Sequence, residues 1–178
     1  MGTGVNQEDG LMSKHMSEDE IHGEHEIRTN SDGIKSAAEN AALYHQICET
    51  FLLQEQDAKQ YSPLTLAYIG DAIYEIIVRT VLVEKGNAPV NTLHKRASKL
   101  VKAEAQKDAF FRIKELLSEE EMAVFKRGRN AKSYTSAKNA SIGDYRIATG
   151  YEALFGYWYL SGQTERMLEM AKVAFTDS

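Results

Sequence analysis

Two acidic side chains stand out because the sequence places each of them among apolar residues. Glu152 is the only charged residue between Arg146 and Glu165, and most of its neighbours are aliphatic or aromatic. Asp71 lies in a second apolar segment and directly follows Gly70. A carboxylate in such surroundings must be paired, protonated or bound to a cation, because desolvating an unpaired charge costs several kcal/mol.

The residue pattern leaves two interpretations of these carboxylates open. In the structural one, Glu152 pairs with Arg79 or a lysine and fixes the register of its helix. In the functional one, Asp71 and Glu152 lie on adjacent helices and share a hard divalent cation such as Mg²⁺. Such an ion would polarise a phosphodiester and lower the pKa of an attacking water. Gly70 would let another backbone or a ligand come close to Asp71.

The net charge of −5 hides an uneven distribution along the chain. Residues 1–60 contain 12 Asp and Glu against 4 Lys and Arg, whereas residues 61–178 contain 14 against 17. Within residues 126–146 the only acidic residue is Asp144, and the basic residues are Lys126, Arg127, Arg129, Lys132, Lys138 and Arg146. This cluster carries enough positive charge to bind a polyanion.

The elements that must position these residues are all predicted to be helices. Prolines and glycines are few, and no apolar/polar alternation typical of strands is present. Ser62-Pro63 is a good helix start, and Ser118 with Glu121 forms a capping-box pattern. The helix after Pro63 is apolar almost all round, which predicts burial on most sides. We expect helices at 63–85, 91–117, 118–128, 144–161 and 163–175, and a polar basic loop at 128–141.

The chain is divided into three segments by its composition. Residues 1–38 are acidic and poor in aliphatic side chains, so we expect a disordered tail. Residues 39–60 carry Leu43, Ile47 and Phe51 at helical spacing, which predicts an amphipathic lead-in helix. Residues 61–178 form the main domain.

The single cysteine and the absence of targeting signals indicate a cytoplasmic protein without a membrane partner. Cys48 alone can form neither an internal disulfide nor a cysteine-based metal cage. No apolar run reaches the roughly 18 residues of a spanning helix, and the N-terminus lacks the features of a signal peptide.

Four motifs, in order between residues 62 and 175, resemble those of the ribonuclease III family. Residues 66–75 (LAYIGDAIYE) resemble the family's signature helix, and residues 151–156 (YEALFG) resemble its second acidic motif. Residues 93–97 (LHKRA) and 127–133 (RGRNAKS) are similar to those of the compact Mini-ribonuclease III subfamily. The Arg-Gly-Arg-Asn segment is the most specific of the four.

This resemblance implies an all-α endonuclease fold that forms a homodimer and cleaves double-stranded RNA with Mg²⁺. The family's metal-binding aspartate and glutamate match Asp71 and Glu152, which are therefore the expected catalytic residues. Members of the subfamily lack a separate double-stranded-RNA-binding domain, and the chain is expected to lack one too. Their role is in maturation of precursor 23S ribosomal RNA, and a large-subunit ribosomal protein is a candidate partner.

Two departures from the larger ribonuclease III enzymes leave the number of metal ions open. Ala67 and Thr149 stand where those enzymes have a glutamate and an aspartate, although both substitutions are usual in the subfamily. Two carboxylates suit one Mg²⁺ with several waters more readily than two ions. Glu75 matches no ligand of the family and is expected to support the ligands or to pair with Arg79.

Without a separate RNA-binding domain, the catalytic domain itself must contact the phosphates. The first expected contacts are Lys126, Arg127, Arg129, Asn130, Lys132 and Lys138, and the second set is Lys95, Arg96 and Lys99. The alternative function is a non-catalytic RNA-binding or ribosome-associated module on the same fold, and a purely helical interaction protein is a third. Loss of Asp71 or Glu152 would favour the non-catalytic module, but both are present.

Overall fold

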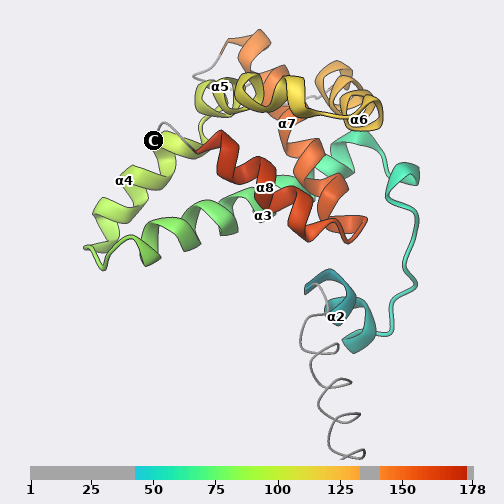
Figure 1. Ribbon diagram of the computed structural model, residues 1–178, viewed down its shortest axis with the longest axis horizontal. Helices are drawn as coiled ribbons and strands as arrows, with labels where there is room; N and C mark the ends of the chain where they lie inside the picture. Colours follow the sequence, from blue (N-terminus) through green and yellow to red (C-terminus); the bar gives the residue numbers. More distant parts are fainter. Residues whose placement is uncertain (1–42, 133–140, 176–178) are drawn as a thin grey trace, which may run out of the picture. The chain divides into compact units, whose positions relative to one another are not determined.

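The computed structural model describes residues 43–132 and 141–175, all of which belong to one compact unit, Ala42–Ser178 (Figure 1). These residues form helices and no strands, as the sequence predicts. The elements are α2 (Leu43–Thr50), η2 (Ala58–Gln60), α3 (Pro63–Glu84), α4 (Val90–Val101), α5 (Ala103–Ile113), η3 (Lys114–Leu116), α6 (Glu119–Asn130), α7 (Ile142–Leu160) and α8 (Thr164–Ala174). None of these helices is long and apolar enough to cross a membrane.

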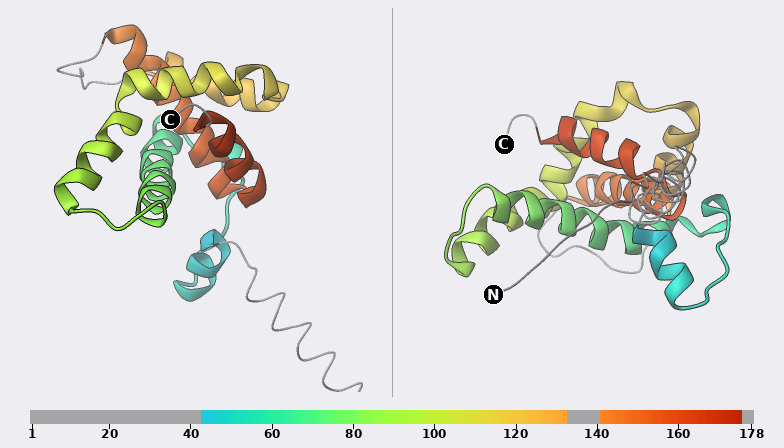
Figure 2. Two further views of the ribbon diagram at one scale, coloured as in Figure 1. Left: turned by 60° about the vertical axis from the view of Figure 1, so that its left-hand side comes forward. Right: turned by 60° about the horizontal axis from the view of Figure 1, so that its bottom comes forward.

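Helix α7 forms the centre of the domain. It packs against α3, α5, α6 and α8, and the two further views show these helices around it (Figure 2). Ten of its residues are buried, including Tyr151, Leu154, Phe155 and Trp158. The rings of Tyr151 and Phe155 meet Tyr74 of α3, whose ring centroid lies 5.0 Å from that of Phe155. The nearly continuous apolar sequence around Glu152 therefore reflects a helix that is covered on most sides.

Two glycines allow α3 and α7 to cross with their backbones in contact. A Cβ atom added to Gly70 would overlap the carbonyl oxygen of Glu152, and one added to Gly156 would overlap the carbonyl oxygen of Leu66. Any larger residue at either position would push the helices apart. The sequence prediction that Gly70 admits another backbone is confirmed, and this contact brings Asp71 beside Glu152.

A second glycine contact joins α6 to α7 and corrects the prediction that the helix after Ser118 ends at Gly128. Helix α6 continues to Asn130, and Gly128 is buried, where a Cβ atom would lie 2.9 Å from the Cα atom of Gly150. The glycine was interpreted as a helix end, but it serves interhelical packing. The basic residues up to Asn130 consequently lie on a helix, and residues 133–140 of the predicted loop lie outside the described residues.

Two other helix predictions need correction. The predicted helix at 91–117 is broken at Lys102, whose extended backbone (ψ 149°) separates α4 from α5. The predicted lead-in helix is described only from Leu43 and ends at Thr50. Its buried residues are Tyr44 and Cys48, whereas Leu43, Ile47 and Phe51 are exposed. The helix therefore forms over part of the predicted range, and the residues whose spacing predicted it are not the ones that are buried.

The helix predicted at 63–85 matches α3 closely and starts with the predicted Ser62 cap, whose side chain accepts a hydrogen bond from the Thr65 N–H at 3.0 Å. Its predicted burial on most sides is wrong, because only six of its 22 residues are buried. Tyr68 is 82% exposed, and Leu64 and Ile76 are exposed as well. Helix α3 therefore has a core-facing side and an apolar side with no partner in the described chain.

A buried polar cluster holds the N-terminus of α6 to α7 and α8. The predicted capping box is confirmed: the Glu121 carboxylate accepts a hydrogen bond from the Ser118 N–H at 2.7 Å. The same carboxylate accepts hydrogen bonds from Trp158 Nε1 at 2.8 Å and Arg166 Nε at 2.9 Å. These bonds outweigh the effect of burial and lower the pKa of Glu121 to about 2. The last two partners could not be inferred from the capping pattern.

Candidate active site

The α3–α7 crossing brings together the two carboxylates that the sequence singled out. Asp71 follows the glycine that contacts the Glu152 backbone, so the two acidic residues lie at the same point of the crossing. Asp71 is exposed and Glu152 is partly buried. Asp71 therefore lies at the edge of the core, and Glu152 is covered on part of its surface.

The surroundings of Glu152 disfavour its charged form. Burial has the largest effect and the negative charge of Asp71 adds to it, so the pKa of Glu152 rises to about 8. The Gln106 side chain acts in the opposite direction, because a nearby neutral donor group favours the charged form of the carboxyl. Desolvation, and secondarily the charge of Glu75, also raises the pKa of Asp71. Among the described residues, no cationic side chain offsets the charge of these two adjacent acidic groups.

The structural interpretation, in which Glu152 pairs with Arg79, does not hold. The Arg79 guanidinium donates instead to Glu75, with Nε 2.8 Å from Oε2. Glu152 makes no salt bridge with any residue of the described ranges. Glu75 is therefore an ion-pair partner of Arg79, one of the two roles expected for it, and the Glu152 carboxylate remains available.

The donor set fits a hard divalent cation. Carboxylate oxygens are the ligands that Mg²⁺ takes from proteins, usually one or two of them with water completing the shell. A cation between Asp71 and Glu152 would favour the ionised form of both groups and remove the repulsion that raises their pKa values. No cluster of three or more His, Cys, Asp or Glu side chains suited to a metal occurs among the described residues. The described residues would thus offer such an ion two carboxylates.

The first set of expected RNA contacts lies at the C-terminal end of α6. Lys126, Arg127, Arg129 and Asn130 are exposed residues of its last turns, and Lys132 follows the helix. Two side chains also have local contacts. Arg127 donates to the Lys59 carbonyl at 3.4 Å, and the Arg129 guanidinium lies 5.9 Å from the Phe125 ring centroid. Lys138 lies outside the described residues.

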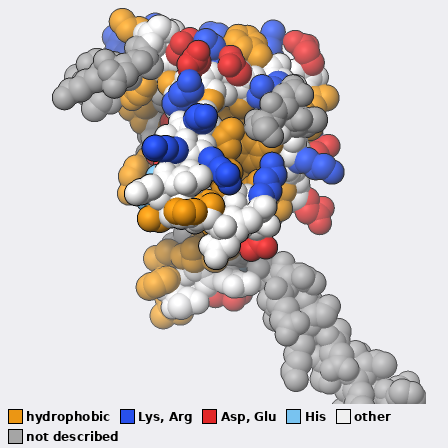
Figure 3. Space-filling model, turned by 90° about the vertical axis from the view of Figure 1, so that its left-hand side faces the viewer, with side chains coloured by type: hydrophobic (Ala, Val, Ile, Leu, Met, Phe, Trp, Pro, Cys, Tyr) orange, Lys and Arg blue, Asp and Glu red, His pale blue; other side chains and the backbone are white. Residues whose placement is uncertain are grey.

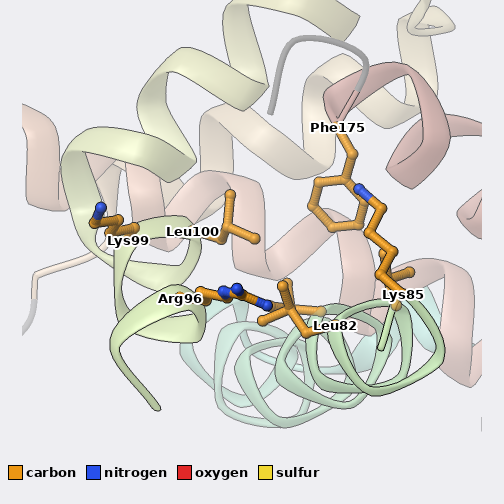
Figure 4. Close-up of a pocket in the computed structure, with 8 residues that line it drawn as sticks. Leu82, Lys85, Arg96, Lys99, Leu100 and Phe175 are labelled. Atoms are coloured by element: carbon orange, nitrogen blue, oxygen red, sulfur yellow. The ribbon is translucent and has the colours of Figure 1, made fainter. Parts of the chain in front are cut away.

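The second set, Lys95, Arg96 and Lys99, is exposed on α4. On the face of the molecule that carries this helix, Lys and Arg side chains surround an apolar strip (Figure 3). Arg96 and Lys99 line a pocket of about 460 Å³ together with Lys85 and Phe175. In the close-up, Arg96 extends toward Leu82, and Lys85 lies beside the Phe175 ring (Figure 4). Sequence reasoning missed Lys85, because only the fold brings the end of α3 next to α4.

The fold and the carboxylate pair agree with the family that sequence comparison identifies. The ribonuclease III domain family matches residues 64–163, a range that includes Asp71 and Glu152. The chain therefore belongs to the ribonuclease III family and is an endoribonuclease.

Within this family the chain falls in the Mini-ribonuclease III group. It is 55% identical over 120 residues to Mini-ribonuclease 3 of Clostridium tetani, covering 67% of this chain and 80% of that protein. It is 50% identical over 117 residues to Mini-ribonuclease 3 of Enterococcus faecalis, covering 65% and 89%. The crystal structure of a Fusobacterium nucleatum protein superposes with a TM-score of 0.63 at 30% identity, over 67% of this chain and 98% of that one.

Proposed function

We propose that this endoribonuclease cleaves double-stranded RNA with Mg²⁺ and acts in the cytoplasm in maturation of the 23S ribosomal RNA precursor. The observation that carries the catalytic part is the pair of carboxylates at the α3–α7 crossing, which has raised pKa values and no cationic partner in the part of the chain that the structure describes. The precursor substrate, and a large-subunit ribosomal protein as partner, are supported by the resemblance to the Mini-ribonuclease III group.

Asp71 and Glu152 would hold the Mg²⁺ through their carboxylate oxygens. When bound, Mg²⁺ would lower the pKa of an attacking water and offset the charge that develops on the phosphate oxygens. The exposed basic residues of α6 and α4 would bind the phosphates on either side of the scissile bond. A-form duplexes are recognised largely through shape, phosphates and 2′-hydroxyl groups, which such surfaces can contact without reading bases.

A homodimer is part of the proposal, because two active sites related by a two-fold axis would each cut one strand of a duplex. The exposed apolar side of α3, with Leu64, Tyr68 and Ile76, supports this assembly. Large apolar side chains grouped on one face are typical of protein–protein contacts, and a second copy of the chain would cover them symmetrically. Asp71 lies on the same helix as this face, so the two active sites of the dimer would be linked through it.

The test is cleavage of a duplex RNA by wild-type protein and by Asp71→Asn. The substitution is nearly isosteric and removes the negative charge that would hold the metal. We expect Mg²⁺-dependent cleavage by the wild type and a loss of at least about 100-fold in the variant, as for removal of one preorganised electrostatic group. The melting temperature and duplex binding should change little.

Glu75→Gln is the matched control, because it removes a carboxylate one helical turn away that is already paired with Arg79. It should retain most of the activity. Near wild-type cleavage by Asp71→Asn would overturn the site assignment. Equal cleavage of a precursor 23S stem and an unrelated duplex of the same length would argue against the substrate assignment while leaving the chemistry intact.

A further inference from the structure

Gln106 on α5 is a buried polar side chain without a hydrogen-bond partner for its nitrogen. It is only 1% exposed, and its Nε2 atom makes no hydrogen bond with any residue that the structure describes. Leaving a buried donor unsatisfied costs about 1–3 kcal/mol. Because native proteins satisfy nearly all such groups, an exception at this depth calls for a functional explanation.

The group that Gln106 faces is the candidate metal ligand Glu152. Helix α5 packs on α7, and the Gln106 side chain lies close enough to the Glu152 carboxyl to favour its charged form. Burial and Asp71 both act against that form. Gln106 is therefore a neutral donor placed where an ionised Glu152 would need a hydrogen bond.

A neutral donor suits this position better than a cation would. Lysine or arginine beside Glu152 would satisfy its charge fully and compete with a metal ion for the carboxylate. An amide N–H can hydrogen-bond one carboxylate oxygen and leave the negative charge for the metal. In a site with only two protein carboxylates, the orientation of each carboxylate has a large effect on metal affinity.

We propose that Gln106 is a positioning residue of the active site. Its Nε2 donates to one oxygen of ionised Glu152 and so directs the other oxygen toward the divalent cation. This inference rests on the proposed function, because it requires a metal ion at Asp71 and Glu152. It also assigns the unsatisfied Nε2 a partner in the charged state of the site.

The experiment compares Gln106→Leu and Gln106→Met with the wild type. Both variants keep a side chain of similar size and remove the donor, and the flexible methionine guards against misfolding of the leucine variant. Mn²⁺ affinity is measured on RNA-free protein by electron paramagnetic resonance, and cleavage is measured across Mg²⁺ concentrations. The melting temperature of each variant is recorded.

We expect Mn²⁺ affinity to fall about 10–100-fold, as for loss of other groups that orient metal ligands. The kcat should fall with an unchanged KM for duplex RNA, and excess Mg²⁺ should restore part of the rate. The melting temperature should stay the same or rise, because an unsatisfied buried amide has been removed. A merely structural glutamine would give a lower melting temperature with unchanged Mn²⁺ affinity and kcat, and that result would overturn the inference.

Gln163→Leu is the control, since Gln163 follows the C-terminal end of α7, donates to Ser161 Oγ at 2.8 Å and should leave metal binding unchanged. Failure of the proposed function gives a different result. In that case wild-type protein would not bind Mn²⁺, and Asp71→Asn would cleave normally, whatever residue stands at position 106.

Discussion

Two glutamates of the same domain differ in how the protein treats their charge. Glu121 is buried and accepts hydrogen bonds from Ser118, Trp158 and Arg166, and its pKa falls to about 2. Glu152 has no cationic partner among the described residues, and its pKa rises to about 8. Both carboxyl groups are desolvated, so the difference between their pKa values comes from the donors that meet Glu121.

The same contrast applies to the positive charges. Arg166 is bound on several sides, to Glu121, Glu169 and the Leu116 carbonyl. Lys126, by comparison, is exposed at the end of α6. The protein satisfies the charges that hold its helices together and leaves others exposed, and our proposal assigns these to a metal ion and a polyanion. Substitutions in the two regions should consequently affect different observables.

The largest effect on stability is expected from Glu121→Gln. Removing one partner of a buried, hydrogen-bonded ion pair costs about 3 kcal/mol, which should lower the melting temperature by several degrees. Cleavage per folded molecule should not change, because Glu121 lies on α6, outside the α3–α7 crossing. Thermal unfolding followed by circular dichroism, with activity corrected for the folded fraction, tests both statements.

The matched control is Glu120→Gln on the same turn. Glu120 pairs with Lys59 at 2.8 Å on the surface, where solvent screens the two charges, so its loss should lower the melting temperature much less. The Glu121 contribution should also depend on pH with a defined sign. Its pKa is lowered from 4.5 to about 2, so its stabilisation is present above pH 4.5 and disappears as the pH falls toward 2. Equal melting temperatures for the two variants would contradict this difference between buried and surface carboxylates.

An intermediate effect is expected from Glu152, with the opposite dependence on pH. Its pKa is raised from 4.5 to about 8, so the metal-free protein should lose stability as the pH rises through that range. Allowing for partial exposure of the side chain, the loss should be about 2 kcal/mol. Glu152→Gln should abolish most of this dependence, and Mg²⁺ should reverse it in the wild type only. Melting curves at pH 5 and pH 9, recorded with a chelator and with Mg²⁺, test this prediction. If the melting temperature of the metal-free wild type does not change with pH, hydrogen-bond donors in the protein already stabilise the charged form of Glu152.

The sequence predicted the helical class, the caps at Ser62 and Ser118, and the isolation of Glu152, because these depend on local patterns. It misjudged Gly128, since a glycine that ends a helix and one that admits a neighbouring helix look alike until the neighbour is known. It missed Gln106 for a related reason. A glutamine on an amphipathic segment gives no sign of burial, and only the packing of α5 on α7 places it beside Glu152.

The division of α4 from α5 was also beyond local reasoning. The sequence around Lys102 contains neither glycine nor proline, and a single extended residue there redirects the chain. The face of α3 that remains exposed could not be identified either, because both sides of that helix are apolar. Interior-facing and partner-facing apolar residues differ in their neighbours and not in their type.

The smallest effect on stability is expected where the basic residues have the fewest partners. Replacing Arg127, Arg129 and Lys132 together by alanine should change the free energy of unfolding by about 0.5 kcal/mol or less, as for other surface sites. Duplex RNA binding should weaken, and its dependence on salt should become shallower by about 0.9 in log K per log[salt] for each phosphate that the variant no longer neutralises. Binding is measured in the Asp71→Asn background, which prevents turnover, across a range of salt concentrations. The parallel alanine variant of Lys95, Arg96 and Lys99 shows which surface binds the phosphates. If the salt dependence of binding stays unchanged in the α6 variant and becomes shallower in the α4 variant, the RNA-binding role belongs to α4 and the pocket beside it.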